Sequence, residues 1–148
     1  MSRPPTILIV DDDEGHSILI RQNLGSVGLK NVIIEFRDGQ AVLDFLFSFA
    51  RQTDRPVRGN PFLLLLDIRM PKIDGVEVLR RIKADPELKK LPVIMLTTTD
   101  DPREVDRCHS LGCNAYLQKP VDYDKFSAAV RSLGEFTKLL QVPELASW

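Results

Sequence analysis

The chain has 148 residues, of which 43% are hydrophobic and 28% charged, a composition typical of a globular protein with one core. Its 20 basic and 21 acidic residues leave a net charge of −1, so the basic excess that binds nucleic acid is absent and no nucleic-acid partner is expected. No apolar run approaches the roughly 20 residues that cross a bilayer, and the first residues lack the pattern of a secretory signal. We therefore expect a cytoplasmic protein with no membrane partner.

Five apolar runs with strand character recur along the chain, at residues 6–10, 32–36, 62–66, 93–96 and 115–117. Three of these runs are apolar at consecutive positions rather than at alternate ones, which indicates strands that are covered on both faces. Coverage of both faces is typical of a parallel sheet between two layers of helices. The runs therefore predict a buried parallel sheet.

The segments between these runs have a helical period and are long enough for the crossovers that parallel strands need. Pro86 should end the third helix. Asp100 or Asp101 should cap the fourth helix, and Gly112 should end it. Residues 51–61 contain two prolines and a glycine and predict a long, exposed loop. The predicted fold class is α/β, a five-stranded parallel sheet with helices on both faces, flavodoxin-like.

Polar side chains gather at the carboxyl ends of four of the predicted strands: Asp11, Asp12, Asp13, Asp67, Thr97 and Lys119. Ligands of an open α/β sheet bind beyond the carboxyl ends of the strands, so these side chains should meet at one edge. Crowded carboxylates repel one another unless a cation lies between them, and Mg²⁺ prefers oxygen ligands. A carboxylate can also be the nucleophile that accepts a phosphoryl group. The set therefore indicates a magnesium-assisted phosphoryl site.

The sequence around these residues forms four motifs, Val10–Asp13, Leu66–Gly75, Pro92–Thr97 and Tyr116–Pro120. Together and in this order they resemble the motif set of bacterial response-regulator receiver domains, over roughly residues 6–133. The resemblance implies the (βα)5 receiver fold and a single-domain response regulator of a two-component phosphorelay. Such a protein accepts a phosphoryl group from a sensor histidine kinase in a Mg²⁺-dependent reaction and signals by protein–protein contact. It is a phosphoacceptor that assists its own phosphorylation and dephosphorylation, rather than an enzyme.

Matched position by position, the resemblance implies that Asp67 is the phosphoacceptor and also a ligand of Mg²⁺. It implies that Asp12 binds the metal directly, that Asp11 helps through water, and that the backbone carbonyl of Arg69 supplies another ligand. Asp13 is expected to be the cap of the first helix rather than a ligand.

The resemblance also implies how the phosphoryl group is held and how its presence is transmitted. Thr97 should donate a hydrogen bond to the phosphoryl group, and Lys119 should form an ion pair with it. Thr97 and Tyr116 should form the switch, with Tyr116 turning inward when Thr97 moves. We expect the bond between Lys119 and Pro120 to be cis, an option specific to proline that would aim the lysine into the site.

Other functions built on a similar sheet lack essential residues here. A phosphatase of this kind needs a second acid two residues after the nucleophile, and Arg69, which stands there, cannot donate a proton at neutral pH. A nucleotide-binding P-loop needs a glycine-rich run ending in Lys-Ser or Lys-Thr, which the sequence lacks. A degenerate receiver that acts only as an interaction or dimerisation module stays open as the alternative, although the intact set of acids, threonine and lysine argues against it.

The histidines and cysteines predict no chemistry of their own. Cys108 and Cys113 are expected to be plain buried thiols. His16 and His109 have the sequence context of neither a zinc ligand nor a catalytic base.

Residues 1–133 are predicted to form the receiver domain, and residues 134–148 a C-terminal extension too short for an output domain. The extension is rich in apolar residues: Phe136, Leu139, Leu140, Val142, Leu145 and Trp148. These side chains predict either packing on their own domain or a dimer arm; we favour the arm, and with it a homodimer. The length and the tail resemble those of stand-alone regulators associated with bacterial phytochrome histidine kinases, which suggests that class of kinase as the partner.

Overall fold

The five apolar runs form the strands of one parallel sheet, of which the three central strands are buried almost throughout. The computed structural model describes residues 4–51, 61–98, 101–140 and 142–143, and the side chains of all of these except 49–51. The strands are β1 (Thr6–Val10), β2 (Ile33–Phe36), β3 (Phe62–Leu66), β4 (Val93–Thr97) and β5 (Ala115–Gln118). The helices are α1 (Glu14–Ser26), α2 (Gly39–Arg51), α3 (Gly75–Ala84), the 3₁₀ turn η1 (Leu88–Lys90), α4 (Pro102–Leu111) and α5 (Tyr123–Thr137).

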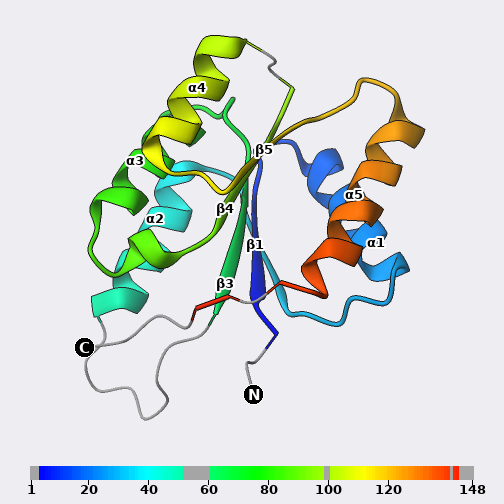
Figure 1. Cartoon of the computed structure of the whole chain (residues 1–148), viewed down its shortest axis with the longest axis horizontal. Coiled ribbons are helices and arrows are strands. Elements are labelled where there is room, and N and C mark those ends of the chain that lie inside the picture. Colours follow the sequence, from blue (N-terminus) through cyan, green and yellow to red (C-terminus); the bar gives the residue numbers. More distant parts are fainter. Residues whose placement is uncertain (1–3, 52–60, 99–100, 141, 144–148) are drawn as a thin grey trace.

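The sheet has the strand order β2-β1-β3-β4-β5, with every neighbouring pair parallel. Helices α1 and α5 cover one face of the sheet, and α2, α3 and α4 cover the other (Figure 1). Successive side chains of β1 and β3 point to opposite faces of the sheet. Leu8 and Leu64 pack in the core on the side of α2 and α3, and Ile7 and Ile9 pack in the core on the side of α1 and α5. The predicted five-stranded α/β sheet with helices on both faces is therefore confirmed.

Short polar side chains and glycine set the ends of the helices. Asp13 caps α1 by accepting a hydrogen bond from the backbone N–H of His16 at 3.1 Å, as predicted. Asp101 caps α4, and Gly112 ends it at a positive φ of 106°, a conformation that glycine adopts without the strain a β-carbon would add. The third helix, α3, ends at Ala84, two residues before Pro86.

Two of the sequence predictions concern residues at or beyond the limits of the described ranges. Most of the loop expected at residues 51–61 lies outside the described residues. Helix α5 continues to Thr137, past the expected end of the receiver domain at residue 133, so that boundary stays a prediction. Within the described ranges, no helix combines the length and the apolar character that a membrane span requires.

Candidate functional site

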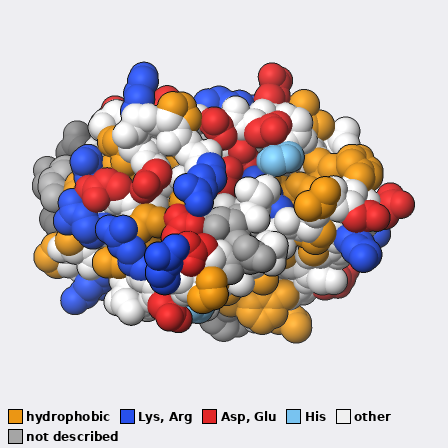
Figure 2. All heavy atoms as spheres, turned by 90° about the horizontal axis from the view of Figure 1, so that it is seen from above, with side chains coloured by type: hydrophobic (Ala, Val, Ile, Leu, Met, Phe, Trp, Pro, Cys, Tyr) orange, Lys and Arg blue, Asp and Glu red, His pale blue; other side chains and the backbone are white. Residues whose placement is uncertain are grey.

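The parallel register brings the acidic residues of two distant motifs to one edge of the sheet. Val10 and Leu66 are partners at the ends of β1 and β3, so Asp11 and Asp67 leave the sheet side by side. The backbone N–H of Asp67 donates to the carbonyl of Val10 at 3.0 Å, which fixes this alignment. Seen from above, toward this edge of the sheet, acidic side chains gather near the middle of the face (Figure 2). Carboxylate oxygens of Asp11, Asp12 and Asp67 lie within 4.8 Å of one another.

The turn that follows Asp67 is built around Gly75. The N–H of Gly75 donates to the carbonyl of Ile68 at 2.9 Å, and a β-carbon at Gly75 would lie only 2.1 Å from the carbonyl oxygen of Asp67. Glycine therefore allows the first turn of α3 to pack directly on the backbone that holds the buried carboxylate.

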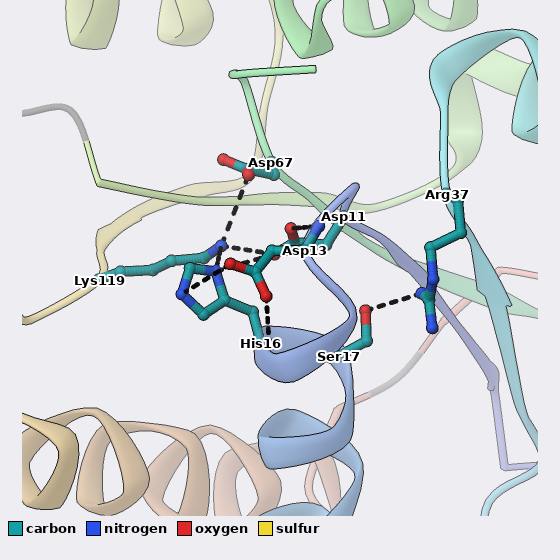
Figure 3. Close-up of polar contacts among 7 residues, drawn as sticks. All are labelled: Asp11, Asp13, His16, Ser17, Arg37, Asp67 and Lys119. Carbon is teal, nitrogen blue, oxygen red and sulfur yellow. Dashed lines mark hydrogen bonds and ion pairs between the residues drawn. The ribbon is translucent and has the colours of Figure 1, made fainter. Parts of the chain in front are cut away.

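Lys119 extends from the end of β5 into this cluster of carboxylates (Figure 3). Its side chain is buried, with Nζ 2.5 Å from Oδ2 of Asp11 and 3.5 Å from Oδ2 of Asp67. Its backbone N–H donates to the carbonyl of Thr97 at 2.6 Å. The described chain contains no cis peptide bond, so the expectation of a cis bond before Pro120 is wrong. The hydrogen bond to Thr97 keeps Lys119 in line with β4, and from there a trans bond already places the amine in the site.

Burial is the main influence on the ionisation of Asp67. It raises the pKa of this carboxyl, because a charged group loses its hydration in the interior. The Lys119 ammonium lowers the pKa again, and the neighbouring carboxylate of Asp11 raises it. The Thr97 hydroxyl lies close enough to favour the carboxylate weakly, but not in the geometry of a hydrogen bond. The ionised site thus holds more negative charge than its single lysine balances.

Two buried polar atoms at the site have no hydrogen-bond partner among the described residues. They are Oδ1 of Asp67 and Oγ1 of Thr97. Buried polar atoms without partners are uncommon and call for an explanation, such as a ligand that they are placed to meet. A carboxylate oxygen can bind a cation, and a threonine hydroxyl can donate to an anion.

The carboxylate cluster fits a hard divalent cation. Asp11 and Asp67 are buried, whereas Asp12 is exposed. All three offer oxygen, the ligand that Mg²⁺ prefers, and the open side at Asp12 leaves room for the waters that this ion retains. Arg69 is exposed, and its side chain bonds Glu104 of α4 at 3.2 Å. The role of the Arg69 carbonyl as a metal ligand stays a prediction.

The two expected switch residues lie in neighbouring strands. Thr97, fully buried at the end of β4, pairs with Gln118 of β5. Two residues earlier in β5, Tyr116 pairs with Met95 and is half-buried against the core on the side of α2, α3 and α4. The sheet therefore joins the two residues through a short path, and their movement stays a prediction.

His16 is the site residue that the sequence analysis missed. Its Nδ1 lies 3.0 Å from Nζ of Lys119 and 3.7 Å from Oδ2 of Asp11. The sequence feature that could have identified His16 is its position in the first turn of the helix after the acidic loop, because that turn starts at the ligand-binding edge. Cys108 and Cys113 are free and buried, as predicted.

Comparison with known proteins agrees with this architecture. The sequence-family model of the response regulator receiver domain matches residues 7–131 of the chain. The response regulator Rcp1 of Synechocystis sp. is 35% identical over 91% of this chain and 90% of its own length. The Mn²⁺-bound form of Rcp1 superposes with a TM-score of 0.83 over 95% of this chain and 99% of that one.

Two further solved structures cover nearly the whole chain. A response regulator receiver domain from Rhodospirillum rubrum is 42% identical, with a TM-score of 0.87 over 95% of this chain and 99% of its own. The phosphorylated cyanobacterial phytochrome response regulator RcpA is 28% identical, with a TM-score of 0.83 over 96% of this chain and 100% of its own.

Proposed function

Because the chain belongs to the response-regulator receiver family, we propose that it accepts a phosphoryl group on Asp67 in a Mg²⁺-dependent reaction. The observation that supports this most directly is the buried carboxylate of Asp67, with Oδ1 unpaired, beside the ammonium of Lys119 and the acids Asp11 and Asp12. The membership itself makes the protein a two-component response regulator, a signalling protein rather than a metabolic enzyme.

In the proposed reaction a carboxylate oxygen of Asp67 bonds to phosphorus while the phosphorus–nitrogen bond of a kinase phosphohistidine breaks. The imidazole leaves with the electron pair and takes up a proton. Lys119 and the hydroxyl of Thr97 would face the three phosphoryl oxygens, over which negative charge spreads in the transition state. Asp11, Asp12 and Asp67, with the carbonyl of Arg69, would hold Mg²⁺, which supplies further positive charge at these oxygens.

The phosphoacceptor can be tested with acetyl phosphate, a small donor that needs no kinase. Incubation with Mg²⁺ should add one phosphoryl group by mass spectrometry, peptide mapping should place it on Asp67, and Asp67→Asn should abolish it. Asp85→Asn is the matched control, because Asp85 is also a buried carboxylate but caps the turn at η1, and asparagine keeps that cap. Equal labelling of Asp67→Asn and the wild type would refute the assignment. Absence of labelling in the wild type would favour the alternative of a degenerate receiver that only mediates contacts.

The metal site has its own test. Asp12→Ala should weaken Mg²⁺ binding in calorimetry and abolish magnesium-dependent phosphorylation, while the fold remains intact because Asp12 is exposed. Asp13→Asn is the control: it keeps the cap of α1 and should bind Mg²⁺ as the wild type does. Unchanged affinity in Asp12→Ala would count against the assigned ligand.

We propose that phosphorylation is transmitted through Thr97 and Tyr116. A phosphoryl group brings about −1.5 to −2 charges, and the unpaired hydroxyl of Thr97 would move toward them and release space next to Tyr116. Beryllofluoride, a phosphoryl mimic, should therefore change the NMR signals of the Tyr116 ring. Thr97→Val should suppress that change, and Thr97→Ser should keep it. The same ring signals in all three proteins, with the mimic bound, would refute this route.

The similarity to a phytochrome regulator indicates a class of kinase partner. RcpA is described as a phytochrome response regulator, and its likeness to this chain favours a bacterial phytochrome histidine kinase as the phosphoryl donor, which would place the exchange in the cytoplasm. Phosphotransfer from a purified phytochrome kinase should outpace transfer from an unrelated histidine kinase, with Asp67→Asn as the blank. Equal rates from both kinases would contradict this choice of partner.

We also propose that the protein forms a homodimer through the exposed side of α5. In the described part of the extension, Val142 is buried and Leu140 packs against the core, whereas Phe136 and Leu139 are 55% and 79% exposed. Phe136 also borders an apolar groove of about 440 Å³ between α5 and the edge strand β5. Exposed apolar groups gathered beside a groove are typical of an interface.

Sedimentation at tens of micromolar tests the dimer, with and without beryllofluoride. The double variant Phe136→Ser/Leu139→Ser should be monomeric, and so should a chain that ends at Gly134. Val121→Ser, which changes a fully exposed apolar residue ahead of α5, should behave as the wild type does. A wild type that stays monomeric in both states would overturn the dimer.

A further inference from the structure

His16 approaches the site from α1 and is held there by contacts with two other elements. Its ring meets the ring of Phe126 of α5 edge-on, with centroids 5.8 Å apart at 85°. Its Nδ1 points at the ammonium of Lys119 from the side opposite Asp67 (Figure 3). The side chain is 36% exposed, so it sits at the rim of the site and not in the core.

The contact between Lys119 and His16 requires Nδ1 of His16 to be the hydrogen-bond acceptor. An ammonium has three donors and no acceptor, so the 3.0 Å contact with Nδ1 is a hydrogen bond only if Nδ1 accepts it. The other ring nitrogen, Nε2, faces Oδ2 of Asp13 at 3.7 Å. Lys119 thereby has one acceptor at Asp11, a second at His16, and the carboxylate of Asp67 as the third and most distant at 3.5 Å.

We propose that His16 is a positioning residue for Lys119: its Nδ1, as acceptor, holds the ammonium on the Asp11 side of the site, so that Lys119 does not close onto the phosphoacceptor. A buried ammonium needs its donors paired, because an unpaired buried donor costs its lost hydration. Without an acceptor at residue 16, the free donor would turn to the remaining partner, Asp67. A closer ion pair there than the present one at 3.5 Å would compete with the incoming phosphoryl group for the nucleophile. This inference rests on the proposed function of Asp67 and adds a residue that controls it.

The substitutions that test this differ only in whether an acceptor remains. In His16→Asn the amide oxygen takes a place close to that of Nδ1, whereas His16→Leu keeps the bulk and removes the acceptor. His109→Leu is the matched control, because this exposed histidine lies near Cys113 and away from the site. All variants are compared at about pH 8, above the range in which histidine side chains usually titrate.

Two measurements keep the outcomes distinct. The first is the rate of phosphorylation by acetyl phosphate, which should fall about tenfold in His16→Leu, the equivalent of one hydrogen bond to a charged group. His16→Asn should stay within about threefold of the wild type, and His109→Leu should match it. The second is the ¹⁵N NMR signal of the Lys119 ammonium in the unphosphorylated protein, which should shift in His16→Leu and much less in His16→Asn.

Because the NMR signal needs no phosphorylation, it separates failure of this inference from failure of the proposed function. A wild type that takes up no phosphoryl group would refute the function, while the ammonium signal would still decide the position of Lys119. Equal behaviour of His16→Leu and His16→Asn in both measurements would overturn the inference, because a purely structural role of the ring would not depend on the acceptor.

Discussion

Lys119→Met should unbalance the buried charges of the site in a way that depends on pH. Lys119 is the only buried cation among the described residues, and it lies between the buried carboxylates of Asp11 and Asp67. Methionine nearly fills the same volume, so the change removes charge without leaving a large cavity. Removing one partner of a buried ion pair typically costs about 3–5 kcal/mol, because the other partner stays buried and uncompensated. The total free energy of unfolding of such a domain is only about 5–15 kcal/mol, so the loss should be easy to measure.

We expect a loss near the lower end, about 3 kcal/mol at pH 7, because Asp11 keeps its hydrogen bond from the backbone N–H of Asp13. At roughly 2–4 °C per kcal/mol, that loss lowers the melting temperature by about 6–12 °C. The sign of the pH dependence follows from Asp67, whose pKa burial raises and Lys119 lowers. Loss of Lys119 raises this pKa further. The destabilisation is therefore full above the folded-state pKa and fades as the carboxyl is protonated at lower pH.

Urea denaturation between about pH 4 and pH 7.5, in EDTA, measures this directly. Lys83→Met is the control, because Lys83 is half-buried and its hydrogen bonds among the described residues go to neutral groups, the carbonyls of Lys89 and Leu91. Its loss should cost about 1–2 kcal/mol, with little change across this pH range. The reasoning is refuted if Lys119→Met loses as much stability at pH 4 as at pH 7, or loses no more than Lys83→Met at pH 7.

Three further predictions test other parts of the site and its core. Asp67→Asn should raise the free energy of unfolding at pH 7, because burial raises the pKa of Asp67 and its charge therefore costs stability above that pKa. The gain, measured in urea melts, should disappear below about pH 3.9, where the carboxyl is protonated in both the folded and the unfolded state. Gly75→Ala should lower the free energy of unfolding by about 1–3 kcal/mol or more, measured in thermal melts, because its β-carbon would lie 2.1 Å from the carbonyl oxygen of Asp67. A β-carbon at Gly25 would have no atom within 4 Å, so Gly25→Ala should raise the free energy of unfolding by about 0.4–1 kcal/mol. Cys108 and Cys113 should react slowly with a disulfide reagent at pH 8 in the folded protein and rapidly in urea, because burial raises the pKa of both thiols, that of Cys108 to about 11; fast reaction in the native state would contradict their burial.

The sequence by itself determined which residues stand at the ligand-binding edge. Continuous apolar runs identify buried parallel strands, and all parallel strands end at the same edge, so a residue that follows a run is placed by its position alone. That logic located Asp11, Asp67, Thr97 and Lys119 before any distance was known, and the register of β1, β3, β4 and β5 agrees with it. The caps at Asp13 and Gly112 were equally readable, because a helix end is a local arrangement of a few residues.

Only the tertiary structure decided which side chains touch. His16 contacts Lys119 across 103 residues, and its orientation depends on how α1 packs against α5 at Phe126. The pairing of Arg69 with Glu104 likewise depends on where α4 lies beside the site. The bond before Pro120, expected to be cis, is trans in the structure; the sequence does not decide this, because an X–Pro bond allows both isomers. The end of a strand is determined by a short-range pattern in the sequence. The contact partners of a side chain depend instead on how whole helices and strands pack, which sums many weak contacts from distant parts of the chain.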